Sequence, residues 1–363
     1  MVNYFNPQKM AQAVRPRIIE NGKYLVAQIE GSGQEADATK VLDSYFRYKE
    51  YIKKPEWLAA TEQEVWSSKF LGLGSAETNA LPRNLKKLEF QNPAYSAAWR
   101  LDGDPRDYNK VFTIQIAGCD YDCIFCYVPK ELNLANPKLG KYFSVKEIVS
   151  CFLAAKEKSE VPMNVVRVSG GNPTIVPEMI LDLWQELKIA SPKTYLWIDS
   201  NLSTSEYMVA LGNKFKEMLR QKNVGVVGCF KGVNAKEFAT ITGVMSELFA
   251  QQFETAEWLI EQGTDFYVYL PDLVYGGDVE GKLINFAQEL MKIRKNLPLR
   301  AEMLAINDYQ GALKNIERCA KLGRLMPATD QRVVLDAWYN KVLPRLYESS
   351  ELNKFCCEVS LGE

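Results

Sequence analysis

Short apolar runs alternate with helical segments from about residue 110 onward, and this alternation restricts the fold more than any other feature of the sequence. The runs are rich in β-branched residues, which favour strands. We predict six strands, at residues 111–118, 164–170, 195–201, 224–230, 266–273 and 299–306. We predict helices at residues 144–160, 177–190, 206–223, 249–263, 286–297, 315–323 and 331–351. Strands that alternate with helices form βαβ units, so the sequence predicts an α/β fold with a parallel sheet and helices outside it.

The segments on either side of this core differ from it in composition and in predicted secondary structure. Residues 1–105 are aromatic and charged, then rich in loop-forming residues, so we predict an N-terminal extension of mixed helix and loop. This extension could cap a substrate pocket. The α/β core spans residues 106–310, and residues 311–363 are predicted to form C-terminal helices.

The composition narrows the classes of function. The chain has 363 residues, of which 47% are hydrophobic and 25% charged, and its formal charge is -1. This balance is typical of a globular protein and disfavours large non-specific nucleic-acid binding, which needs many cations. We see no secretory segment and no membrane-spanning run, so we expect a cytoplasmic protein without a membrane partner. The absence of histidine excludes imidazole acid–base catalysis and histidine-ligated metals.

Unusual residues gather at the carboxyl ends of the predicted strands. The first strand is followed by GCDYDCIFC, the second by SGGNP and the third by DSN. Cys229 and Lys231 end the fourth strand, and PDLVYGG follows the fifth. Because the carboxyl ends of parallel strands share one edge of a sheet, where such folds bind ligands, these stretches predict a single site.

Three cysteines, Cys119, Cys123 and Cys126, have the spacing C-x3-C-x2-C in the first of these loops. In a reducing compartment, clustered thiols indicate a metal more often than a disulfide. A [4Fe–4S] cluster normally takes four thiolates, so three would leave one iron open for a substrate or cofactor. A structural zinc would need a fourth ligand, and the sequence has neither histidine nor a second C-x2-C pair. Zinc and three incidental buried thiols are the alternatives.

The other cysteines have simpler interpretations. Cys151 and Cys319 lie on apolar faces of predicted helices, and we expect both in the core. Cys356 and Cys357 are adjacent near the end of the sequence, and we expect them in a loose tail.

The cysteine spacing, with the aromatic Phe125 before the last cysteine, resembles the signature of the radical S-adenosylmethionine (radical SAM) enzymes. Arg-Val-Ser-Gly-Gly-Asn-Pro at 167–173 is similar to the Arg-x-Ser-Gly-Gly-Glu-Pro of that family. Asp-Ser-Asn-Leu at 199–202, together with Lys231, resembles the branch that contains pyruvate formate-lyase activating enzyme. The resemblance covers roughly residues 106–310. It implies a partial (β/α)6 TIM-like radical SAM barrel, here with an N-terminal extension and C-terminal helices.

The resemblance also implies a mechanism and a set of site residues. Cys119, Cys123 and Cys126 would hold a [4Fe–4S] cluster whose open iron binds the amino and carboxylate groups of S-adenosyl-L-methionine (SAM). The reduced cluster would cleave SAM to methionine and a 5′-deoxyadenosyl radical, which abstracts hydrogen from a substrate. Lys231, grouped with the cysteines as catalytic, would give a cation to the SAM carboxylate. The implied cofactor-binding residues are Phe125, Tyr127, Ser169, Gly170, Gly171, Asn172, Asp199, Asn201, Lys231, Leu304 and Ile306.

Three departures from the family pattern concern this site. Asn172 stands where the family has Glu, which leaves the role of this side chain open. Cys229 stands where the branch has Asp, which argues against a monovalent-cation site near SAM. No histidine can contact SAM from the last strand, and we expect Leu304 and Ile306 to replace it.

The substrate stays open among several classes. The favoured prediction is a radical SAM enzyme, with anaerobic iron–sulfur oxidoreductase or lyase chemistry, acting on a dedicated small molecule, nucleotide, RNA or peptide. Trp57, Trp66 and Trp99 could stack on a base, although core packing is the commoner fate of tryptophan. The alternatives are an activase of a glycyl-radical enzyme and a non-enzymatic, metal-stabilised interaction protein. The expected partners are an electron donor such as flavodoxin or ferredoxin and the substrate, which could be a protein; nucleic acid is not favoured.

Overall fold

A parallel sheet forms the centre of the computed structural model, which describes residues 4–28, 40–41, 45–50, 93–108, 110–203, 205–304, 306 and 310–362. Trp57 and Trp66 lie outside the described residues. Six neighbouring strands run parallel in the order β5, β7, β8, β9, β10 and β11. They span Lys110–Ile116, Val165–Gly170, Tyr195–Ser200, Val224–Cys229, Asp265–Pro271 and Ala301–Leu304. The prediction of a parallel α/β fold built on six strands, the partial barrel, is confirmed.

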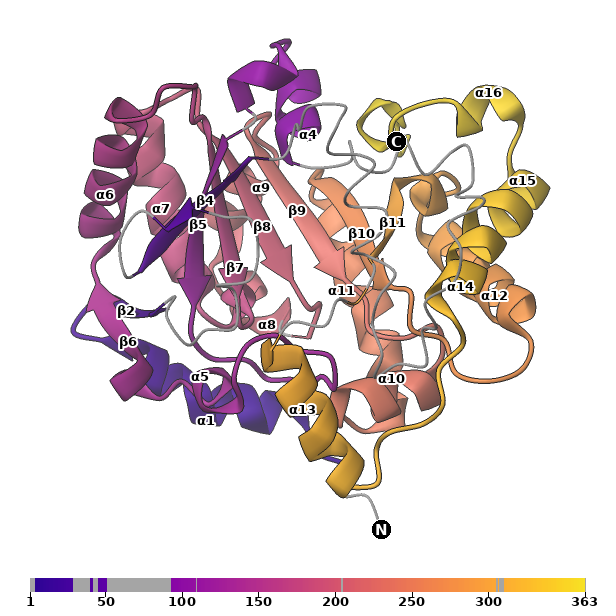
Figure 1. Cartoon of the computed structure of the whole chain (residues 1–363). Helices are drawn as coiled ribbons and strands as arrows, with labels where there is room; N and C mark the ends of the chain where they lie inside the picture. The colour runs from indigo at the N-terminus through magenta and orange to yellow at the C-terminus, as the bar shows by residue number, and fades with distance from the viewer. Residues whose placement is uncertain are drawn as a thin grey trace.

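Helices connect these strands and cover the outer face of the sheet (Figure 1). They are α6 (Val145–Glu157), α7 (Pro177–Ala190), α8 (Ser205–Ala210), α9 (Gly212–Leu219), α10 (Ala235–Thr242), α11 (Ala250–Glu261) and α12 (Val279–Ile293). A capping box of Ser144 and Glu147 starts α6. The predicted helix 206–223 is wrong as a single helix, because Gly212, the first residue of α9, has φ +63° and the helix is interrupted there. No helix in the described part of the chain is long and apolar enough to cross a membrane.

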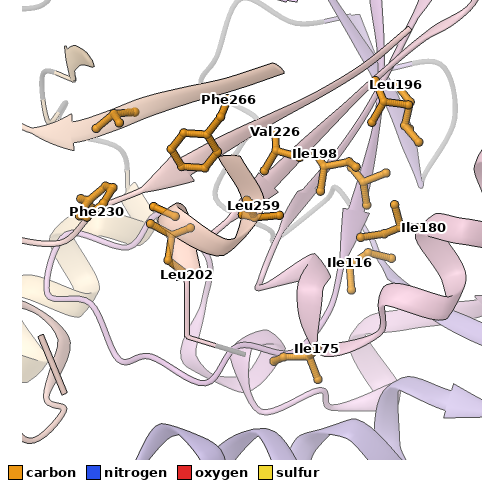
Figure 2. Close-up of a cluster of buried hydrophobic side chains, with 14 of the residues drawn as sticks. Ile116, Ile175, Ile180, Leu196, Ile198, Leu202, Val226, Phe230, Leu259 and Phe266 are labelled. Atoms are coloured by element: carbon orange, nitrogen blue, oxygen red, sulfur yellow. The ribbon is translucent and has the colours of Figure 1, made fainter. Parts of the chain in front are cut away.

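The main hydrophobic core lies between the sheet and these helices. Strand residues such as Ile116, Ile198 and Val226 point toward side chains of the covering helices, including Ile180 of α7 and Leu259 of α11 (Figure 2). All five side chains are at most 2% exposed. Alternate residues of the same strands therefore face the other way, into the barrel.

The N-terminal extension adds strands to the sheet. After α1 (Pro7–Ile18) come β1 (Ile19–Glu20), β2 (Lys23–Ala27), β3 (Lys40–Val41) and β4 (Phe46–Glu50). Strand β4 runs antiparallel along the free edge of β5, and β2 pairs with β5 at Val26 and with β6 (Gly140–Phe143). The described part of the extension therefore widens the sheet, which the expectation of helix and loop did not include. Its role as a substrate cap stays a prediction.

The two predicted C-terminal helices, 315–323 and 331–351, differ from the structure in opposite ways, because the first is longer than predicted and the second is broken. Helix α13 (Gln310–Lys321) is continuous, but the predicted helix 331–351 divides into α14 (Gln331–Asp336), a π-helical turn (Ala337–Val342), α15 (Leu343–Leu346) and α16 (Ser349–Leu352). Pro344 lies in this stretch, and proline cannot donate a helical hydrogen bond.

The last residues pack against the amino-terminal end of the barrel, so the expectation of a loose tail was wrong. Cys356 and Cys357 are 2% and 5% exposed. The buried Arg300 guanidinium holds the tail, because its Nε donates to the Val359 carbonyl at 2.7 Å and its Nη1 to the Asp265 carboxylate at 2.8 Å. The tail thus closes the amino-terminal end of the barrel.

The two ends of the barrel differ in what surrounds them. In Figure 1 the arrowheads of the parallel strands point toward α5 (Lys130–Asn133), α10 and α13, whereas α4 (Pro93–Arg100) and the C-terminus lie at the opposite end. Aromatic rings fill the interior of the barrel on the side of the amino-terminal ends of the strands. Among them, Trp197 and Tyr267 stack with centroids 5.3 Å apart. A reactant in the barrel is therefore confined to the end where the strands finish.

Candidate functional site

The three predicted cysteines lie on one loop, between β5 and α5, at the carboxyl end of the sheet. Main-chain hydrogen bonds fix this cysteine loop from two sides. Cys119 N donates to the Asn133 carbonyl at 2.8 Å, Asp122 N to Thr242 O at 2.9 Å, and Ile124 N to Ile241 O at 2.9 Å. Cys123 is buried, and Cys119 and Cys126 are half-buried. The loop is thus held between α5 and the end of α10.

The electrostatics of the three thiols fit a metal cluster. Burial is the largest influence on the pKa of each thiol. It raises the pKa of Cys119 well above its ordinary value, raises the pKa of Cys123 to about 12, and also raises the pKa of Cys126. Three thiolates gathered in so dry a place need positive charge nearby, which the irons of a cluster would supply. Among the described residues, no three Cys, Asp or Glu side chains converge on one ion position, the three cysteines of this loop included.

Amide groups also approach the sulfurs. The Asn133 side-chain Nδ2 lies 3.5 Å from Cys126 Sγ, and the main-chain N of Tyr121 lies 3.5 Å from Cys119 Sγ. The Asn201 Nδ2 is 3.9 Å from the same Cys119 sulfur. N–H groups that point at thiolate sulfurs would tune the reduction potential of a cluster bound by this loop.

The SGGN segment lies directly against the start of the cysteine loop. Gly171 N donates to Ile116 O and Asn172 N to Gly118 O, both at 2.8 Å. A methyl group on Gly171 would lie 1.8 Å from the Gly118 carbonyl oxygen, a distance that no side chain can occupy. Gly170 has φ +105°, which non-glycine residues rarely adopt. The predicted glycines therefore allow a close backbone approach beside the cysteines.

The Asn172 side chain has a structural partner in the cysteine loop. Its Nδ2 donates to Asp120 Oδ1 at 3.0 Å and to Ser203 Oγ at 3.1 Å, and its Oδ1 accepts from Thr174 at 2.8 Å. Asp120 is fully buried and also accepts from Asn201 at 2.7 Å and from Ser203. Burial raises the pKa of Asp120, and the hydrogen bonds from Ser203, Asn201 and Asn172 oppose that rise. Asn172 therefore joins the two loops and meets a carboxylate that a glutamate would repel.

Asp199 near the end of β8 and Asn201 directly after it lie beside this network, and both side chains have protein partners. Arg167 binds the Asp199 carboxylate, with its Nη2 2.8 Å from Oδ2. The main-chain carbonyl of Asn201 accepts a hydrogen bond from the Gln252 side chain at 2.9 Å, and the side-chain Nδ2 of Asn201 donates to Asp120. Ser169 is buried at the end of β7. Direct SAM contacts from these three residues stay predictions.

Lys231 reaches the cysteines from the end of β9. Its ammonium lies 5.6 Å from the centroid of the Phe125 ring, as in a cation–π pair. Burial alone would lower the pKa of Lys231, but the nearby thiolates, first Cys229 and then Cys123, raise it above its ordinary value. The structure therefore places a protonated amine next to the sulfurs, where it favours negative charge.

The remaining predicted residues lie near the same edge. Tyr127 is half-buried, and its carbonyl packs against Gly311 at the start of α13. The carbonyl of Leu304 accepts from Asp272 N at 3.0 Å. The amide and carbonyl of Ile306 both bond to the Gln331 side chain, at 2.7 and 3.2 Å. These main-chain groups of Leu304 and Ile306 are therefore engaged within the protein.

A charged cluster behind the cysteine loop was missed by sequence reasoning. The Asp122 carboxylate is bound by Lys130 at 2.8 Å, Arg318 at 2.6 Å and Arg324 at 2.8 Å. Burial alone would raise the pKa of Asp122, but the bonds from Arg318 and Lys130 outweigh it and lower the pKa. The cluster attaches α13 to the loop, so the C-terminal helices help to shape the site. Charged residues so far apart in the sequence give no local signal.

The chain has distant similarities among solved structures. No curated protein matches the chain. Among solved structures, the chain is similar to Streptococcus suis SuiB bound to the precursor peptide SuiA, with 18% identity and a TM-score of 0.37, over 50% of this chain and 36% of that chain. It is also similar to a radical SAM methyltransferase from Sphaerobacter thermophilus, with 12% identity and a TM-score of 0.39, over 61% of this chain and 65% of that chain. The chain thus spans little more than a third of SuiB, and neither likeness bears on its reaction.

A family profile gives the identification. The profile of the Radical SAM superfamily matches residues 113–279, a stretch that contains the cysteine loop, the SGGN segment and Lys231. The narrower resemblance to the branch of pyruvate formate-lyase activating enzyme is not confirmed. The segment that carries the site therefore belongs to the radical SAM superfamily, whose members are enzymes.

Proposed function

We propose that the chain is a radical SAM enzyme in which Cys119, Cys123 and Cys126 hold a [4Fe–4S] cluster and the neighbouring SGGN segment binds SAM. The observation that carries the proposal is that one buried and two half-buried thiols lie on a loop beside a glycine backbone that is packed too closely for any side chain. When bound, the reduced cluster and SAM supply a 5′-deoxyadenosyl radical that takes a hydrogen atom from the substrate.

The residues of the chain prepare and protect this chemistry. The buried loop keeps water from the cluster, and the half-buried Phe125 covers it from the side of Lys231. The Lys231 ammonium offsets thiolate charge and offers a cation to the carboxylate of SAM. The stacked Trp197 and Tyr267 rings fill the barrel toward the amino-terminal ends of the strands. The substrate must therefore meet the radical near the carboxyl ends of the strands.

The partners follow from the same proposal. The cluster needs one electron for each SAM cleaved, which we expect from a small carrier such as flavodoxin or ferredoxin. The substrate is a dedicated small molecule, nucleotide or peptide. No feature of the described residues favours the activase of a glycyl-radical enzyme over these.

Cluster binding tests the proposal. The protein is reconstituted with iron and sulfide without oxygen, and bound iron and the EPR spectrum of the reduced cluster are measured with and without SAM. We expect the wild type and Cys151→Ala, whose cysteine lies half-buried on α6 away from the loop, to bind a full cluster whose spectrum changes with SAM. Cys123→Ala should bind little iron. A full cluster in Cys123→Ala would refute the proposal.

A further inference from the structure

Gln115 is a buried polar residue to which no role has been assigned. It lies on β5, next to the last residue of the strand, and is 1% exposed. Neither its Nε2 nor its Oε1 has a hydrogen-bond partner within the described ranges of the chain. A buried amide normally pairs both groups, because leaving them unpaired opposes folding. An amide kept in this state is therefore expected to have a partner outside the protein.

The strand geometry shows where this amide points. Phe112, Ile114 and Ile116 belong to the core between the sheet and the helices, whereas Val111 packs with Trp197 inside the barrel. Residues alternate between the two faces of a strand, so Gln115 faces the barrel interior together with Val111. In the register of the strands it lies one layer beyond Trp197, on the side of the cysteine loop, and level with Tyr267.

The amide also lies at the level of the glycine segment. Gln115 pairs in register with Ser169 on β7. A methyl group placed on Gly170 would lie 2.9 Å from Gln115 Nε2, so the amide nitrogen rests against the Gly170 backbone. Cys119 follows four residues after Gln115 in the sequence. The unpaired amide is therefore next to both the glycine backbone and the cysteine loop.

We propose that Gln115 is a further cofactor-binding residue, which hydrogen-bonds the methionyl end of SAM. This inference rests on the proposed function, in which the SGGN segment binds SAM, and it adds that the methionyl end is the part that meets this segment. A carboxamide matches the chemistry, since its N–H donates to a carboxylate and its carbonyl accepts from an ammonium group. It adds neutral, directional contacts to the point charge of Lys231, which has no directional preference of its own.

The test separates binding from folding. Gln115→Leu and Gln115→Met remove the amide but keep much of the volume, and Thr113→Val is a control on the same face of β5, one layer further from the cysteine loop. The dissociation constants of SAM and of 5′-deoxyadenosine, which lacks the methionyl group, are measured by calorimetry on anaerobic, cluster-loaded protein. The melting temperature is measured on the same proteins without the cluster.

We expect both Gln115 variants to weaken SAM binding by about 10- to 100-fold, as for lost hydrogen bonds to charged groups, with 5′-deoxyadenosine binding and the control unchanged. Their melting temperatures should be equal to or above that of the wild type, because an unpaired buried amide has been removed.

Unchanged SAM binding in both variants would overturn the inference. So would an equal loss for SAM and 5′-deoxyadenosine, which would move the contact to the nucleoside end, or a clear fall in melting temperature in both variants, which would make Gln115 structural. A wild type that binds no SAM would instead overturn the proposed function, and the inference with it.

Discussion

Changing Asn172 to aspartate tests how the cysteine loop is held against the SGGN segment. The Nδ2 of Asn172 lies 3.0 Å from Asp120 Oδ1, so the substitution puts two carboxylates in contact in a fully buried site. At that separation two charges repel by about 5.5 kcal/mol for an effective dielectric constant of ~20. Keeping one carboxyl protonated at neutral pH costs at most about 4 kcal/mol, from ~1.36 kcal/mol per pH unit above an ordinary pKa of ~3.9. The pair will take the cheaper state and share a proton.

Asn172→Asp should therefore lower the free energy of unfolding by about 3 to 4 kcal/mol near neutral pH, measured by urea titration without the cluster. The shared proton raises the pKa of the pair in the folded protein above its unfolded value. The deficit should be small below about pH 4 and grow by up to ~1.4 kcal/mol per pH unit until the folded pKa is passed.

The exchanged variant, Asp120→Asn with Asn172→Asp, provides the control. It restores one carboxylate facing one amide, so it should recover most of the lost stability at neutral pH. A single variant as stable as the wild type would refute the reasoning, as would a deficit that does not change with pH. An exchanged variant no better than Asn172→Asp would show that the two side chains do not act as a pair.

Three further predictions follow from contacts around the site. Asn133→Leu removes the amide 3.5 Å from Cys126 Sγ, so the midpoint potential of the cluster should fall on the order of tens of millivolts in an EPR-monitored titration; an unchanged potential contradicts a role for this contact. Arg324→Met should lower the free energy of unfolding by about 2 to 4 kcal/mol in urea titrations at neutral pH. Because the pKa of Asp122 is lowered in the folded protein, its ionised carboxylate stabilises the fold above the unfolded pKa of ~3.9, and this stabilisation is lost as the pH falls through the folded pKa. The loss of stability in Arg324→Met should therefore shrink in acid. A loss that stays constant with pH would count against the ion pair. Cys356 and Cys357, buried with raised pKa values, should resist thiol labelling in the native protein and react in urea, as followed by mass spectrometry of the labelled peptide; fast native labelling would contradict their burial.

Features that depend on neighbouring residues could be predicted from the sequence. The β-branched runs of β5 to β10 lie where expected, because burial on both faces of a parallel strand leaves an unbroken apolar run. Helix α7 has the predicted bounds, with proline in its first turn, and α6 begins within one residue of the predicted start. The three cysteines lie on one loop for the same reason, since only six residues separate Cys119 from Cys126.

Features that depend on distant partners could not be predicted. Asp120 lies between two recognised cysteines, but its partners Asn172 and Ser203 are 52 and 83 residues away. Cys356 is buried by the packing of the tail, to which Arg300 binds through the Val359 carbonyl, and these interactions form only in the folded chain. Gln115 reads in the sequence as an ordinary polar residue in a strand, and its unpaired state follows only from the packing around it.

Cleavage of SAM is the measurement that bears most directly on the proposed function. The reconstituted protein is mixed with SAM and dithionite without oxygen, and 5′-deoxyadenosine is measured by mass spectrometry against the Cys119→Ala, Cys123→Ala and Cys126→Ala variants. We predict 5′-deoxyadenosine from the wild type and none above background from the three variants. A wild type that binds a full cluster but leaves SAM intact, or a cysteine variant that cleaves SAM as fast as the wild type, would contradict it.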